Sequence, residues 1–158
     1  CLFRINRDVR FSANKAPYKT NFSAYLSKGG KKYPGAGYYF HFEPGASFLA
    51  AGIWMPEPDL LKAIRQEVDY GWDAFSVLLD RAAQAGLQFE GEKLSRPPKG
   101  YEADHPAIEV IKHKSFVLTA PFDMQTDAAA LQALFHAHIV QLKPFVYFLN
   151  QASDALSL

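Results

Sequence analysis

The chain has 158 residues, of which 49% are hydrophobic and 21% are charged, and its formal net charge is +1. This composition excludes a disordered chain, and the low net charge gives no general attraction to nucleic acid or acidic membranes, so any anion site must be local. The single cysteine excludes an internal disulfide, and no apolar run is long enough to cross a bilayer. We therefore expect one soluble, cytoplasmic domain.

The first half of the chain is predicted to form an antiparallel meander. Apolar and polar side chains alternate over residues 20–27, 37–43 and 47–55, as they do in half-buried strands. A basic, glycine-containing loop at residues 28–35 and a turn at residues 43–46 connect them. The small residues Ala50, Ala51 and Gly52 indicate that another element packs close to the third strand.

The second half is predicted to be mainly helical. Helices are expected at residues 56–70, 72–85, 105–113 and 126–151, and further strands at residues 87–94 and 115–120. Gly71 and Gly86 are expected to end the first two helices, Asp104 and Thr126 to cap the last two, and Pro144 to kink the last one. Strands followed by helices mixed with strands predict a single-domain α+β fold, with an antiparallel sheet of three strands and one or two more packed against helices.

Residues 4–19 hold five cationic side chains interleaved with apolar ones, which favours a site for phosphate or carboxylate over a plain charged surface. Arg7 falls in register with the apolar positions of this segment, so it should be paired with a carboxylate or a bound anion. Asp8 or Glu43 is a candidate for an internal partner. Both interpretations, ligand site and internal ion pair, are open at this point.

A second basic segment, residues 93–101, contains Arg96, Lys99 and Tyr101 beside two prolines. It is either a solvated loop stiffened by the prolines or an anion-binding loop that faces the first cluster, helped by the N-terminus of a helix near His105.

His41 and Glu43 share one face of the second predicted strand with Tyr39. They could be a general base with its orienting carboxylate, or two metal ligands. No further His or Cys stands at a diagnostic interval, so no metal site is predicted, and no phosphate-loop, dinucleotide-binding or nucleophile-elbow motif is present. The cofactor, if there is one, and whether the protein is an enzyme are open.

The opening stretch matches the signature R-x-x-R-D-x-R-F-x-x-[DN]-K-x-x-Y at Arg4, Arg7, Asp8, Arg10, Phe11, Asn14, Lys15 and Tyr18. With the later runs Gly-Tyr-Tyr at residues 37–39, Gly-Ile-Trp-Met-Pro at residues 52–56 and Pro-Lys-Gly-Tyr at residues 98–101, the chain resembles a mostly bacterial family of uncharacterised proteins, domain of unknown function 2461. The resemblance covers nearly the whole chain and implies no particular activity. It implies that a helical segment that precedes the signature in the family is missing here.

We expect a concave, cationic, aromatic-lined pocket for a small anionic ligand that bears a phosphate or carboxylate. The candidate ligand-binding residues are Arg4, Arg7, Asp8, Arg10, Lys15, Tyr18, Arg96, Lys99 and Tyr101, and the candidate catalytic residues are His41 and Glu43. A nucleic-acid-associated module, which the low net charge disfavours, and a structural or protein-interaction domain with the arginines in internal salt bridges are the alternatives. No membrane partner is expected, and the oligomeric state is open.

Overall fold

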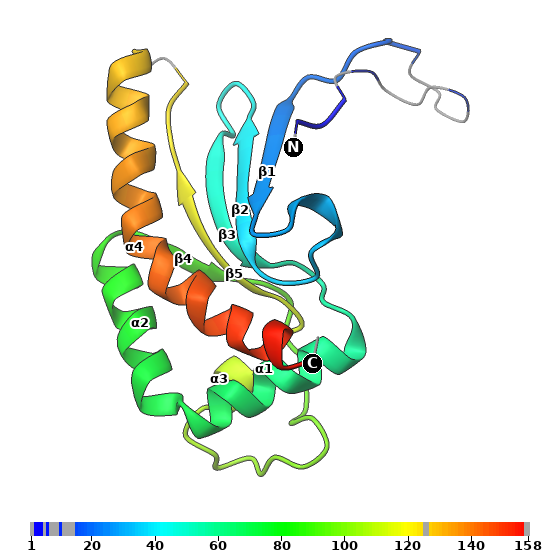
Figure 1. Ribbon diagram of the computed structural model, residues 1–158, viewed down its shortest axis with the longest axis vertical. Helices are drawn as coiled ribbons and strands as arrows, with labels where there is room; N and C mark the ends of the chain where they lie inside the picture. The colour runs from blue at the N-terminus through cyan, green and yellow to red at the C-terminus, as the bar shows by residue number, and fades with distance from the viewer. Residues whose placement is uncertain (1, 5, 7–9, 11–14, 125–126, 157–158) are drawn as a thin grey trace.

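A five-stranded antiparallel sheet with helices packed on one face forms the fold, as Figure 1 shows for the computed structural model. The structure describes residues 2–4, 6, 10, 15–124 and 127–156. The strands are β1 (Phe22–Ser27), β2 (Gly37–Phe42), β3 (Phe48–Ile53), β4 (Gln88–Glu90) and β5 (Phe116–Pro121), in the order β1-β2-β3-β5-β4. The helices are α1 (Pro58–Tyr70), α2 (Trp72–Gln84), α3 (Ile108–Ile111) and α4 (Ala128–Ala155), with the 3₁₀ helix η1 at Gly30–Lys32. The predicted α+β single domain with an antiparallel sheet is therefore confirmed.

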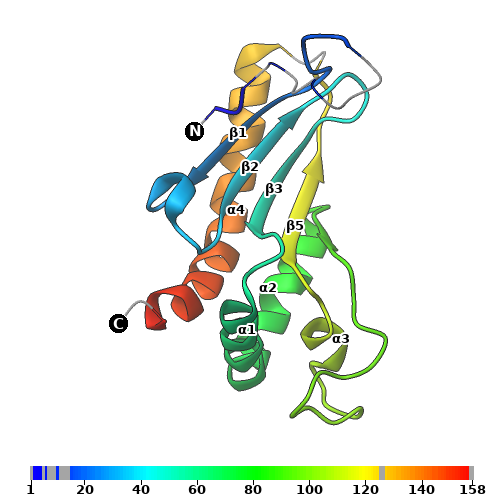
Figure 2. The same ribbon diagram turned by 90° about the vertical axis from the view of Figure 1, so that its right-hand side faces the viewer.

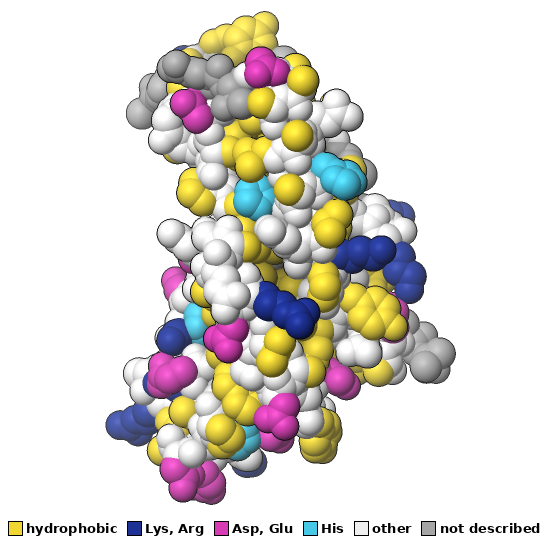
Figure 3. Space-filling model, turned by 90° about the vertical axis from the view of Figure 1, so that its left-hand side faces the viewer, with side chains coloured by type: hydrophobic (Ala, Val, Ile, Leu, Met, Phe, Trp, Pro, Cys, Tyr) yellow, Lys and Arg dark blue, Asp and Glu magenta, His cyan; other side chains and the backbone are white. Residues whose placement is uncertain are grey.

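The core lies between the sheet and the helices, because alternate strand residues face α1, α2 and α4. The pairing places Phe40 beside Leu49, and Leu49 beside Ala120, on this covered face. Against them the helices present a shared set of fully buried apolar side chains: Ile64, Val68, Phe75, Leu142, Phe145 and Leu149. The surface of the helical layer, seen in Figure 3, mixes hydrophobic side chains with charges of both signs.

The opposite face of the sheet is open. Figure 2 shows the strands in front of the helices, and in the described part of the chain no helix covers this side. Residues 2–4 run beside the outer edge of β1, where Leu2 pairs with Ala24 and the amide of Phe3 donates to the carbonyl of Ser23 at 3.0 Å. The open face is thus bordered at one edge by the start of the chain.

Several boundaries differ from the predicted ones. Strand β4 ends at Glu90 instead of continuing to residue 94, because Gly91 has a φ of +142° that breaks the extended backbone. Helix α3 is one turn, and Asp104 does not cap it: Ala107 precedes it, and the ring Nδ1 of His105 accepts the Ala107 amide at 3.1 Å.

Helix α4 begins after Asp127, whose carboxylate accepts from the amides of Ala129 and Ala130 at 2.9 and 3.1 Å. Thr126, the predicted cap, lies outside the described residues. Figure 1 shows α4 changing direction along its length, and Pro144 lies inside this helix, where it removes a backbone hydrogen bond.

Candidate functional site

A groove of about 740 Å³ opens on the uncovered face of the sheet. Its floor is made of small residues on the neighbouring strands β2 and β3, namely Gly37, Ala50 and Gly52. Around the floor stand aromatic side chains from three strands and two loops: Tyr25, Tyr33, Tyr39, Phe48 and Trp54. The groove therefore combines a flat base with aromatic walls, which is a shape suited to a planar ligand.

The floor is flat because the backbones approach closely. Gly52 has a φ of +134°, and a Cβ at this position would collide with the backbone carbonyl of Phe116 on β5. A Cβ on Gly37 would meet the side chain of Tyr25, whose hydroxyl donates to the carbonyl of Gly35 at 3.3 Å. The run of small residues in β3 predicted that another element packs close to this strand. At Gly52 that element is β5.

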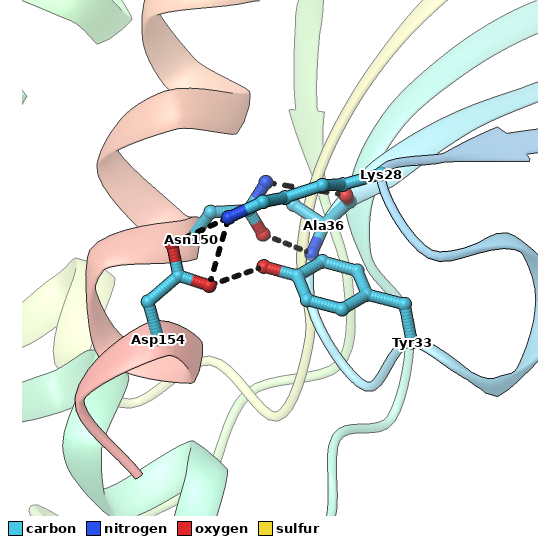
Figure 4. A network of polar contacts seen from close by, with 5 residues as sticks. All are labelled: Lys28, Tyr33, Ala36, Asn150 and Asp154. Atoms are coloured by element: carbon cyan, nitrogen blue, oxygen red, sulfur yellow. Dashed lines mark hydrogen bonds and ion pairs between the residues drawn. The ribbon is translucent and has the colours of Figure 1, made fainter. Parts of the chain in front are cut away.

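The wall formed by Tyr33, Pro34 and Gly35 is fastened to the C-terminal end of α4, as Figure 4 shows. The hydroxyl of Tyr33 donates to Asp154 at 3.0 Å, and the Lys28 ammonium lies 3.1 Å from the other oxygen of the same carboxylate. Burial, together with this hydrogen bond to Asp154, raises the pKa of Tyr33 to about 12. The groove wall is therefore held by a helix from the opposite layer.

The rim of the groove carries the most exposed tryptophan. Trp54 lines the groove while 70% of its surface is accessible, and the next residue, Met55, has a φ of +46°. The Met55 amide donates to the hydroxyl of buried Ser115 at 2.9 Å, which holds this turn. A non-glycine residue in the left-handed region is uncommon, and such strain concentrates at functional sites.

A chain of polar contacts runs along β2 at one end of the groove. The Tyr39 hydroxyl lies 3.2 Å from Nδ1 of His41, and Nε2 of His41 lies 3.0 Å from Oε2 of Glu43. The other carboxylate oxygen of Glu43 accepts from the hydroxyl of Thr20 at 3.3 Å. The hydrogen bond from His41 lowers the pKa of Glu43, so the carboxylate is ionised at neutral pH.

This series of polar contacts has the geometry that the sequence predicted for the His41 and Glu43 pair, with the carboxylate orienting the imidazole. The ring of His41 also stacks on Phe48, with 4.9 Å between the centroids. Their catalytic role stays a prediction. No cluster of three or more His, Cys, Asp or Glu side chains suited to a metal ion occurs in the described ranges.

The described part of the cationic signature begins beside the groove. Phe3 packs edge-on against the Tyr39 ring at a centroid distance of 6.1 Å, and Arg4 follows it directly with an exposed side chain. Asn6 pairs with Tyr18 in an isolated bridge. Arg10, Lys15 and Tyr18 are exposed. Arg7 and Asp8 lie outside the described residues, and both interpretations of Arg7 stay predictions.

Of the two interpretations of the second basic loop, the one in which it faces the first cluster does not agree with the structure. Arg96 and Lys99 are exposed in the connection between β4 and α3, and Figures 1 and 2 both place this connection at the end of the molecule opposite the N-terminal segment. Tyr101 is half-buried and packs against His105, whose Nε2 lies 2.8 Å from a carboxylate oxygen of Asp69. The two segments separate because the first pairs with β1 and the second leads into α3, next to α1.

The lining that the structure describes contains Glu90 as its charged side chain and no Lys or Arg. The sequence predicted a pocket that is both cationic and aromatic-lined, but the described lining is aromatic without a cation and includes none of the predicted ligand-binding residues. The sequence prediction missed the residues that form this groove, above all Trp54, Tyr25 and Tyr33. One signal was available: Tyr25 and Tyr39 fall on the same side of their alternating strands, and the register pairs them directly.

Comparison with known families gives one match. The model of the family described as "Conserved hypothetical protein (DUF2461)" matches residues 1–148. Searches of curated proteins and of solved structures gave no significant match. Within the ranges that the structure describes, no helix has both the length and the hydrophobicity needed to cross a membrane.

Proposed function

The chain belongs to the DUF2461 family, described as conserved hypothetical proteins, and from the groove we propose that it binds a small organic molecule with a flat ring and a carboxylate or phosphate group. The ring would lie on the floor of Gly37, Ala50 and Gly52, between the aromatic walls. The observation that carries the proposal is this aromatic groove on a sheet face that no described helix covers.

The rim supports this proposal. Trp54 exposes 70% of its surface at the edge of the groove, although burying an aromatic ring of this size is favourable. A bound ring would cover it. The strained backbone at Met55 fixes the position of Trp54 before a ligand arrives, which reduces the entropy lost on binding.

The start of the cationic signature supports a position for the anionic group of the ligand. Phe3 packs on Tyr39, so the N-terminal segment that carries Arg4 passes the Tyr39 end of the groove. Glu90 lines the β4 side and disfavours negative charge there. An anionic group would therefore point away from Glu90, toward the N-terminal segment and its arginines.

A matched set of probes tests the proposal: 2-naphthoate, 2-naphthyl phosphate, the neutral 2-naphthalenemethanol and inorganic phosphate. Thermal shift and ligand-observed NMR would measure binding, since a probe at a hundredfold excess over its Kd adds about 2.7 kcal/mol of stability. We expect the two anionic naphthyl probes to bind best, the neutral one more weakly and inorganic phosphate least.

Two groove variants and one control locate the binding. Trp54→Ala removes the rim, and Ala50→Leu fills the floor, so both should weaken 2-naphthoate binding by about tenfold or more. Tyr70→Ala removes an aromatic ring that is 84% exposed at the end of α1, outside the groove, and should bind like the parent. Arg4→Gln should weaken the anionic probes and leave the neutral one unchanged.

Equal binding of 2-naphthoate by the parent and by Ala50→Leu would show that the groove is not the site. A short single-stranded DNA that stabilises the protein with steep salt dependence, where no naphthyl probe does, would favour a nucleic-acid-associated module instead.

A further inference from the structure

Tyr39 lines the groove, and its hydroxyl is hydrogen-bonded to an imidazole. It lines the groove on β2, and its hydroxyl lies 3.2 Å from Nδ1 of His41. His41 is largely enclosed, with 13% of its side chain accessible, and it is not a lining residue of the groove, whereas Tyr39 is.

The direction of each hydrogen bond follows from the chemistry of Glu43. Its ionised carboxylate can only accept, so Nε2 of His41, 3.0 Å away, must carry the hydrogen. In the neutral imidazole Nδ1 is then the acceptor, and the Tyr39 hydroxyl donates to it. The Tyr39 proton is therefore already directed at a base, and Glu43 is placed to stabilise the imidazolium that would form.

The two other tyrosines of the groove are held differently. Burial raises the pKa of Tyr25, whose hydroxyl donates to the carbonyl of Gly35. Burial and the hydrogen bond to Asp154 raise the pKa of Tyr33 to about 12. Neither hydroxyl donates to an imidazole in these contacts, so both serve as internal standards for the reactivity of Tyr39.

We propose that Tyr39 is a catalytic nucleophile that accepts an acyl group from an activated carboxylic ester on the ring-bearing ligand, with His41 as its general base and Glu43 as a positioning residue. This inference rests on the proposed ligand site, because the acyl donor must lie in the groove. The arrangement of nucleophile, base and orienting carboxylate is the one that activates hydroxyl nucleophiles in general.

The step is balanced. The Tyr39 oxygen attacks the carbonyl carbon and forms a C–O bond, its proton passes to Nδ1 of His41, and the bond from the carbonyl carbon to the leaving oxygen breaks. The leaving group takes the electron pair and then the proton from His41. An acyl donor fits better than a phosphoryl donor, because the described lining holds no Lys or Arg to offset the charge of a transferring phosphoryl group.

Benzenesulfonyl fluoride reports on the same nucleophile, since a tyrosine oxygen that attacks its sulfur displaces fluoride and leaves a stable sulfonate ester. Peptide mass spectrometry on the full chain would measure the labelling rate of each tyrosine. Because general-base assistance contributes a hundredfold or more in typical sites, we expect Tyr39 to be labelled at least about tenfold faster than Tyr25 and Tyr33.

Variants separate the roles. Tyr39→Phe should abolish the fast labelling, and His41→Gln should reduce it about tenfold, to the rate of the other tyrosines. Glu43→Gln keeps an acceptor for Nε2 but removes the negative charge, so it should slow labelling while ¹⁵N NMR shows the His41 tautomer unchanged. Tyr70→Phe, the loss of one exposed hydroxyl outside the groove, should leave the Tyr39 rate at the parental value. Circular dichroism confirms that each variant is folded.

The acyl assignment is tested with 4-nitrophenyl benzoate, whose nitrophenolate should be released in a burst that Tyr39→Phe lacks. Uniform labelling of the three tyrosines, or a Tyr39 rate that His41→Gln does not change, would overturn the inference, as would fast labelling without a burst. Binding of 2-naphthoate is measured on the same samples. If the parent binds 2-naphthoate but Tyr39 is not reactive, only the proposal of a nucleophile is overturned. If the parent does not bind 2-naphthoate, the proposed function itself is overturned.

Discussion

The side chain of Asn150 on α4 makes hydrogen bonds with both backbone groups of Ala36, in the way that a neighbouring strand would. Its Oδ1 accepts from the Ala36 amide at 2.6 Å, and its Nδ2 donates to the Ala36 carbonyl at 3.4 Å (Figure 4). Ala36 is only 1% exposed and directly follows the groove wall formed by Tyr33, Pro34 and Gly35. Helix α4 thereby supplies the hydrogen-bond partners of a buried backbone segment, and this segment shapes the groove on the sheet.

Replacing Asn150 with alanine should therefore destabilise the protein and loosen the groove wall. Both polar backbone groups of Ala36 would lose these partners, at a cost of about 2 kcal/mol in the free energy of unfolding. Chemical denaturation measures this loss, and 2-naphthoate binding should weaken in parallel. The exposed neighbour Gln151 supplies the control, since Gln151→Ala should change stability by less than about 0.5 kcal/mol. Equal effects of the two variants would show that the pairing contributes little.

The start of α4 gives a second prediction. The Asp127 carboxylate accepts from two amides that have no partner inside the helix, so Asp127→Ala should lower the free energy of unfolding by about 1 kcal/mol. Thr126→Ala tests the competing sequence prediction and should have a smaller effect in the same denaturation experiment. A larger loss of stability in Thr126→Ala than in Asp127→Ala would show that Thr126 is the capping residue.

Local pattern predicted the strand faces well, because alternation acts along each strand separately. By this rule Tyr39 and His41 fall on one face of β2, and Glu43, the residue after the strand, continues that face. The hydrogen bond between His41 and Glu43 follows from their spacing. The capping residue of α4 was harder to predict, because Thr126 and Asp127 are adjacent and both residue types are good caps.

The groove could not be predicted, because it depends on which face of the sheet the helices cover. Helices α1 and α2 intervene between β3 and β4, and β5 then enters between those two strands. No local pattern fixes that order. The same long-range arrangement decides that the connection between β4 and α3, which contains Arg96 and Tyr101, lies far from the N-terminal segment, although both segments are basic and rich in aromatic or proline residues.

Two glycines with positive φ should respond very differently to alanine. At Gly52, with a φ of +134°, a Cβ would collide with the carbonyl of Phe116, so Gly52→Ala should cost about 3 kcal/mol or more and disrupt the pairing of β3 with β5. Gly45, with a φ of +75°, has open space around the same position, so Gly45→Ala should cost only about 1 kcal/mol. Thermal unfolding of both variants checks the difference, and similar losses would mean that backbone conformation alone, without the collision, sets the cost.

Stability should fall on acidification because of His113, which is 4% exposed and whose Nδ1 has no hydrogen-bond partner in the described structure. Burial, with a smaller contribution from the charge of Lys93, lowers the pKa of His113 to about 4. In the unfolded chain a histidine titrates near 6.5, so between about pH 6.5 and pH 4 the unfolded state binds more protons than the folded state. The free energy of unfolding should therefore decrease as the pH falls through this range, by about 2 to 3 kcal/mol in total.

His113→Leu removes the titrating group from the same buried position and should make the free energy of unfolding nearly independent of pH between 6.5 and 5. The matched substitution His136→Leu, at an exposed position of α4, should keep the parental slope. Urea denaturation at a series of pH values measures all three proteins. If His113→Leu keeps the slope of the parent, the acid sensitivity comes from carboxylates instead. Hydrogen bonds lower the pKa values of four carboxyl groups: Glu43, Glu92, Glu109 and Asp154. These groups also lose stabilising interactions when they are protonated.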